Sequence, residues 1–138
     1  MFSCGAAVTE PCGDCGSTMH CELVQRIVDA RLHWSIEGRC SGCGAAFCTF
    51  GWDDTPTQVR EAIIAAGELA RLTVVLAEGT SKVALLKVFR ESGASLPEAV
   101  ASAERALTTG IEGTPVELEL LARRLREKDV PTVIRSEA

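Results

Sequence analysis

The pattern Cys-x-x-Cys-Gly occurs twice in this chain of 138 residues, at residues 12–16 and again at residues 40–44. At this spacing a tight turn aims both sulfurs at one ion, and the following glycine supplies a backbone conformation that a Cβ would hinder. Two such knuckles provide four thiolates, a closed tetrahedral set that is typical of structural Zn²⁺. The sequence therefore predicts a zinc site formed by Cys12, Cys15, Cys40 and Cys43.

The segment between the two knuckles has the pattern of a β-hairpin, with strands near residues 21–28 and 31–37. Its apolar side chains are Val24, Ile27, Val28, Leu32, Trp34 and Ile36. A hairpin that joins two such knuckles resembles a zinc ribbon. The register of the ligands stays open at this point, because Cys4 or Cys48 can replace one of the knuckle cysteines.

Other uses of these thiols fit the pattern less well. A redox-active Cys-x-x-Cys needs one pair at the start of a helix that follows a strand, without a second pair. A catalytic zinc site keeps one position open, which four cysteine ligands would close. The remaining Cys4, Cys21 and Cys48 have two interpretations: with His20 they hold a second metal ion, or they are small buried apolar residues.

The composition changes sharply after the second knuckle. All seven cysteines precede residue 49, and the sequence D-D-T-P-T at 53–57 marks a domain boundary. We predict a zinc ribbon at 1–53, a connecting helix at 54–70 and a second domain at 71–138. No run approaches the ~20 apolar residues of a membrane span, and no export signal is evident, so we expect a cytoplasmic protein whose cysteines bind metal.

The second domain alternates strand and helix patterns in the order β-α-α-β-α-β. Strands are expected at 71–77, near 108–111 and at 130–135. Helices are expected to begin at Thr80, Ser95 and Thr114, and the connecting helix at Thr55; the last three positions each open a capping box. The fold class is therefore α+β: a zinc-ribbon hairpin domain, a helical connector, and a small domain with helices on one face of a three-stranded sheet.

The first helix of that domain has an unusual distribution of apolar residues. At about 100° per residue, one side is apolar and should face the core. The opposite arc contains three cations with two apolar residues among them: Lys82, Val83, Leu86, Lys87 and Arg90. Apolar side chains surrounded by cations are typical of a docking face for an acidic partner. The alternative is that Val83 and Leu86 lie under the following helix.

Residues 71–135 resemble the C-terminal domain of the bacterial ribosomal stalk protein. Residues 82–90, K-V-A-L-L-K-V-F-R, fit the family's Lys-Val-Ala-x-x-Lys-x-x-Arg helix, and residues 96–99, L-P-E-A, fit its Leu-x-Glu-Ala helix start. The resemblance implies that this helix face, Lys82, Val83, Leu86, Lys87 and Arg90, recruits a translational GTPase, an elongation factor.

The chain also departs from the stalk family. The turn at 91–95 is one residue shorter and less rich in glycine, Val100 stands where the family has a lysine, and a zinc ribbon stands in place of the family's dimerisation helices and hinge. A chain of this kind can therefore keep the fold and bind a different partner.

Charge and catalytic residues limit the function classes. The net charge is −5, and residues 1–55 contain three basic against seven acidic side chains, so a nucleic-acid partner is disfavoured. The only histidines are His20 and His33, and no phosphate-binding loop is present. We do not expect an enzyme.

Three functional hypotheses follow from the sequence. The first is a non-catalytic, zinc-containing protein-binding module, which docks a translational GTPase or another ribosome-associated partner. The second is an immunity or antitoxin protein whose acidic surface masks a cationic toxin. The third, a zinc-ribbon factor that contacts nucleic acid, is opposed by the acidic ribbon.

Overall fold

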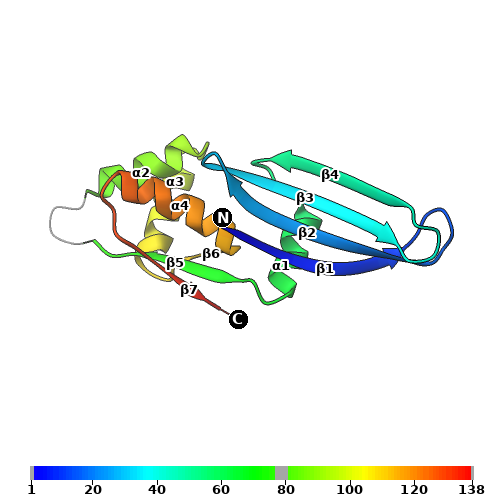
Figure 1. The fold of residues 1–138 in the computed structure, drawn as a ribbon. Helices are drawn as coiled ribbons and strands as arrows, with labels where there is room; N and C mark the ends of the chain where they lie inside the picture. The colour runs from blue at the N-terminus through cyan, green and yellow to red at the C-terminus, as the bar shows by residue number, and fades with distance from the viewer. Residues whose placement is uncertain (1, 77–80, 138) are drawn as a thin grey trace. The chain divides into compact units, whose positions relative to one another are not determined.

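The computed structural model describes residues 2–76 and 81–137 and has an α+β fold. The chain forms two compact units (Figure 1). The first comprises Met1–Leu69 together with Thr114–Val116, and the second comprises Ala70–Gly113 and Glu117–Ala138. The fold class expected from the sequence, an N-terminal antiparallel sheet followed by a small second sheet with helices, is confirmed.

The first unit is built on a four-stranded antiparallel sheet in the order β1-β2-β3-β4. Its central hairpin, β2 (Thr18–Val28) and β3 (Arg31–Cys40), is the predicted one, with longer strands. The hairpin turn is made by Asp29 and Ala30, whose φ angles of 50° and 60° suit the tight turns that match strand twist. Two strands that the sequence pattern did not predict, β1 (Ser3–Pro11) and β4 (Ala46–Trp52), flank the hairpin.

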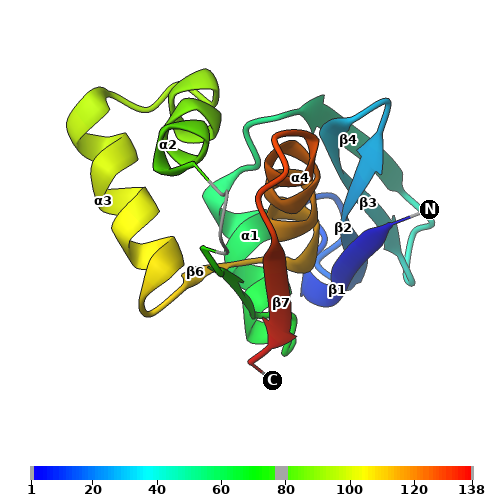
Figure 2. The same cartoon turned by 90° about the vertical axis from the view of Figure 1, so that its left-hand side faces the viewer.

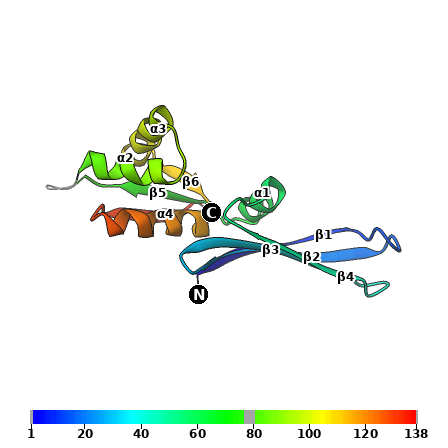
Figure 3. The same cartoon turned by 90° about the horizontal axis from the view of Figure 1, so that it is seen from above.

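One face of this sheet is buried. On β2 every second side chain is inaccessible: Met19, Cys21, Leu23, Gln25 and Ile27. Helix α1 (Thr57–Ala65) packs against β1 and β2 and inserts Val59 and Ile63, both completely buried. Figure 3 shows this helix on one side of the four strands.

The capping box predicted at Thr55 does not form. Pro56 is the N-cap of α1, and no side chain caps the helix. Instead, the Thr55 hydroxyl accepts a hydrogen bond of 2.9 Å from Gln25 Nε2. A buried amide needs a partner more than a helix end does, because the first N–H groups of a helix can be solvated by water.

The second unit follows the predicted order β-α-α-β-α-β. Its elements are β5 (Ala70–Val74), α2 (Lys82–Glu91), α3 (Leu96–Leu107), β6 (Ile111–Gly113), α4 (Pro115–Glu127) and β7 (Thr132–Ser136). The three strands pair antiparallel in the order β6-β5-β7. Figures 1 and 2 show α2, α3 and α4 on one side of this sheet. The core between these layers is apolar and contains Leu72, Leu85, Val88, Ala103, Leu118 and Leu125.

The helix starts in this unit are set by side-chain caps. The Ser81 hydroxyl accepts from the N–H groups of Val83 and Ala84 at 3.2 and 3.4 Å; the predicted cap, Thr80, lies outside the described residues. The predicted capping box at Ser95 forms: Ser95 Oγ accepts from the Glu98 N–H at 3.3 Å, and the Ser95 N–H donates to Glu98 Oε1 at 3.0 Å. No helix in the described ranges is long and apolar enough to cross a membrane.

Candidate metal centre

The two cysteine knuckles lie at the same end of the first sheet. Cys12 and Cys15 are in the loop between β1 and β2, while Cys40 ends β3 and Cys43 lies in the loop to β4. The loops are neighbours because β2 and β3 pair directly, with Met19 opposite Cys40. The register of the central hairpin therefore decides which thiols meet.

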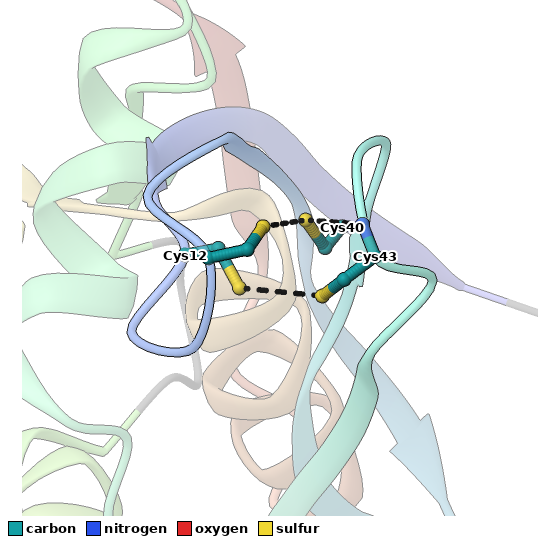
Figure 4. Close-up of side chains that lie close together, drawn as sticks. Cys12, Cys40 and Cys43 are labelled. Carbon is teal, nitrogen blue, oxygen red and sulfur yellow. Dashed lines mark hydrogen bonds between the residues drawn. The ribbon is translucent and has the colours of Figure 1, made fainter.

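The structure brings the four predicted sulfurs together. All four Sγ atoms lie within 4.8 Å of one another, with 3.8 Å between Cys12 and Cys43 and 3.5 Å between Cys15 and Cys40. Figure 4 labels Cys12, Cys40 and Cys43, whose side chains converge from the two loops. A tetrahedron with metal–sulfur bonds of ~2.3 Å has edges of about 3.8 Å. The cluster therefore has the size of a metal site with four sulfur ligands.

Each knuckle is held by the same pair of backbone hydrogen bonds. The Cys12 N–H donates to the Ser17 carbonyl at 2.7 Å, and the Gly16 N–H donates to the Cys12 carbonyl at 2.9 Å. Cys40 repeats this pattern with Ala45 and Gly44, at 2.8 and 3.2 Å. Both glycines have left-handed φ angles, +74° at Gly16 and +75° at Gly44. The glycine that follows the second cysteine of each motif thus adopts a left-handed backbone conformation, which other residues adopt only at a cost in free energy.

A further glycine, which the sequence pattern did not single out, allows the two loops to approach. A Cβ on Gly42 would lie 2.4 Å from Ser17 Oγ and 3.3 Å from Cys15 Sγ. Any side chain at this position would separate the second knuckle from the first. In the sequence, Gly42 occupies only a variable position of the Cys-x-x-Cys motif. The need for glycine there arises from the neighbouring loop, which the local pattern does not reveal.

The surroundings of the sulfurs favour negative charge on two of them. A hydrogen bond from the Ser17 side chain, with help from its backbone, lowers the pKa of Cys15 to about 6. The pKa of Cys40 is lowered by the N–H groups of Cys43 and Gly42, which lie 3.5 and 3.3 Å from its sulfur. Thiolates at neutral pH are what a metal ion requires.

The pKa of Cys43 is raised because three other cysteine sulfurs lie close to it. The Ala45 N–H lowers its pKa, but the neighbouring Cys15, Cys40 and Cys12 sulfurs raise it to about 12. The cluster can therefore hold some thiolates alone, whereas four at once need a positive ion among them.

The remaining cysteines are separated by the sheet. Cys4 and Cys21 are buried on the face covered by α1, where Cys4 Sγ donates to Gln25 Oε1 at 3.5 Å. Cys48 and His20 line a pocket of about 680 Å³ on the other face. Among the residues described, Cys12, Cys15, Cys40 and Cys43 form the one group close enough to hold an ion. Cys4 and Cys21 are buried, as the interpretation of these cysteines as small apolar residues predicts. Cys48 is exposed and does not fit that interpretation.

The predicted docking face on α2 is accessible. Lys82, Lys87 and Arg90 are exposed, and so is 64% of the Val83 side chain. Leu86 is half-buried and packs against the core. Within the described part of the chain, none of the three cations forms an ion pair. The alternative that both apolar residues are covered does not hold for Val83, which is exposed.

Comparison with known proteins returns no match: no family model, no curated protein and no solved structure is significantly similar to this chain.

Proposed function

We propose that the four cysteines bind one structural Zn²⁺ and that the chain is a non-catalytic protein-binding adaptor. The α2 face docks a macromolecule with an acidic surface, and the resemblance to the ribosomal stalk domain makes a translational GTPase the first candidate. The observation that carries the docking proposal is Val83, 64% exposed on a helix face where Lys82, Lys87 and Arg90 are exposed too and form no ion pair with any residue that the structure describes.

The chemistry of the ligands supports zinc. Four thiolates in a tetrahedron suit Zn²⁺ or iron and are poor ligands for Mg²⁺ or Ca²⁺. Because four protein ligands close the coordination sphere, such a site stabilises the fold and leaves no position for a substrate. The hydrogen bonds from Ser17 and from the N–H groups of Gly42 and Cys43 orient and charge the sulfurs.

Elemental analysis of the purified chain tests the metal. We expect about one zinc ion per chain, lost in Cys12→Ser and kept in the control Cys48→Ser, whose thiol lies outside the cluster. Iron in place of zinc would contradict the assignment of the ion. Full zinc content in Cys12→Ser would contradict the assignment of the ligands.

The docking face has the composition of a protein interface. An exposed apolar residue gains free energy when a partner covers it, and surrounding cations steer an acidic partner towards it. The adjacent α3 adds two more exposed apolar side chains, Leu96 at 53% and Val100 at 41%. Val100 stands where the stalk family has a lysine, so the partner surface should be more apolar than an elongation factor's contact with the stalk.

Calorimetric titration with a purified elongation-factor GTPase tests the docking. Lys87→Glu combined with Arg90→Glu should weaken binding ~10-fold or more, because it reverses two charges that face the partner. The matched control is Arg123→Glu combined with Arg126→Glu, which makes the same charge change on α4. Equal binding by both double variants would reject the α2 face, and no binding by the unaltered chain would reject the GTPase as partner.

A further inference from the structure

Strand β4 is an edge strand that lacks the usual protection. Among the strands of the described residues it pairs with β3 alone. Its sequence A-F-C-T-F-G-W contains no charged residue and no proline, and all its residues except Gly51 are exposed. Phe50 is 62% exposed, Phe47 40% and Trp52 38%. Proteins usually blunt such an edge with lysine, proline or a bulge, because its free N–H and C=O groups recruit another strand.

The other edge of the same sheet is different. Strand β1 ends in Glu10 and Pro11 and exposes mainly small side chains. Such protection is therefore present on β1 and absent on β4.

The backbone of β4 shows which groups are free. The Cys40 N–H donates to the Ala45 carbonyl, and the Asp53 N–H donates to the Leu32 carbonyl. Because alternate residues of a strand point to the same side, odd-numbered residues of β4 bond to β3. The N–H and C=O groups of Ala46, Cys48 and Phe50 point to the open edge, as does the Trp52 N–H, while the Trp52 carbonyl accepts from the Asp54 N–H at 2.8 Å.

We propose that β4 pairs antiparallel with β4 of a second copy of this chain, about a two-fold axis at Thr49. In this register Thr49 faces the partner copy's Thr49, and every aromatic residue faces a small one: Phe47 opposite Gly51, Phe50 opposite Cys48, and Trp52 opposite Ala46. The even-numbered residues, whose N–H groups point to the open edge, form the hydrogen-bonded pairs. The odd-numbered ones form the non-hydrogen-bonded pairs.

Two of the three aromatic side chains of β4, Phe50 and Trp52, already have ring contacts within the chain. The His33 ring stacks on Phe50 at 5.6 Å and meets Trp52 edge-on at 4.7 Å, while the Arg31 guanidinium lies 4.8 Å above the Trp52 ring. A rigid aromatic row loses little conformational entropy on association. An uncharged, size-complementary strand fits a copy of itself better than a charged peptide, and a two-fold contact needs no other surface.

The mass of the zinc-loaded chain in solution, by analytical ultracentrifugation, tests the dimer. We expect twice the chain mass of 14.7 kDa. Phe50→Lys should return the protein to monomers with its zinc content unchanged, because it places a cation on the open edge and leaves the knuckles intact. The matched control, Val8→Lys on β1, alters an exposed apolar residue of the other edge and should remain dimeric. Monomers in the unaltered chain, or dimers in Phe50→Lys, would overturn the proposal.

A cross-link tests the register. In a Cys48→Ser background, Thr49→Cys places two thiols at the two-fold axis with Cα atoms ~4.5 Å apart, within disulfide range. Oxidised glutathione as oxidant should then give a covalent dimer on a non-reducing gel. Ala46→Cys in the same background is the control, since its two copies would lie roughly 20 Å apart. A cross-link at Ala46→Cys, or none at Thr49→Cys, overturns the Thr49-centred pairing.

Discussion

The two units of this chain bury different kinds of side chain. In the second unit the interior is apolar, and Leu72 and Leu85 are completely buried. In the first unit Gln25 and Thr114 are as inaccessible as Ile63. The second unit is therefore stabilised mainly by apolar burial. The first also depends on internal hydrogen bonds and, on our proposal, on an ion at one end of its sheet.

Removing the metal should show the difference most strongly. Structural zinc contributes ~10–16 kcal/mol in small zinc-dependent domains, and here α1 packing should retain part of the fold. We expect a chelator to expose the amides of both knuckles and the adjoining ends of β1–β4 to hydrogen exchange. The amides of α2 and α3 should stay protected. Equal loss of protection in both units would contradict the comparison.

A cavity in the second core should have the next largest effect. Leu85→Ala removes a completely buried side chain and should lower the free energy of unfolding by ~2–5 kcal/mol. Hydrogen exchange should rise in the second unit, while the zinc content stays the same. The control is Val83→Ala on the same helix, where 64% exposure predicts a change below about 0.5 kcal/mol. Loss of zinc in Leu85→Ala would show that the two units are not independent.

Substitution of the buried Gln25 tests how much the internal hydrogen bonds stabilise the first unit. Gln25 Nε2 donates to Thr55 at 2.9 Å, and Gln25 Oε1 accepts from the Thr114 hydroxyl at 2.5 Å. Gln25→Leu leaves both hydroxyls without this partner and should cost ~1–3 kcal/mol in denaturant unfolding. Replacing both threonines by valine as well should recover much of that loss, because the polar groups are then removed together.

The exposed Gln58 gives the matched control for that substitution. Gln58→Leu should leave the unfolding midpoint nearly unchanged. A Gln25→Leu protein as stable as this control would mean that the amide network adds nothing to the first unit.

The capping box of α3 should give the smallest effect. Ser95→Ala should cost about 1 kcal/mol in thermal unfolding, and Ser102→Ala within the same helix should be nearly neutral. The hydrogen bonds from Ser95 lower the pKa of Glu98 below its ordinary value of 4.5. The contribution of the Glu98 carboxylate is therefore present above pH 4.5 and is lost as the pH falls through the lowered pKa. A Ser95→Ala defect that grows in acid would contradict this sign.

Local patterns made much of the fold predictable. Alternating and helical periodicities gave the central hairpin and the β-α-α-β-α-β order, because these signals depend on neighbouring residues. Strands β1 and β4 were missed for a local reason too: β1 is rich in small residues, and β4, A-F-C-T-F-G-W, lacks a regular alternation of apolar and polar residues. The Thr55 capping box failed because Pro56, one residue later, is the N-cap of α1, while the Thr55 hydroxyl accepts from Gln25, thirty residues earlier.

The sequence determined the residue types and spacings of the metal centre, since two cysteines at i and i+3 followed by glycine need only a local turn to aim two sulfurs together. The tertiary structure decided that the two pairs meet, because the pairing of β2 with β3 places the loops side by side and Gly42 leaves room between them. The tertiary structure also decided which apolar residues of α2 are covered: Val83 is exposed and Leu86 is half-buried. Periodicity gives the direction of a side chain on a helix, but only packing against distant segments removes it from water.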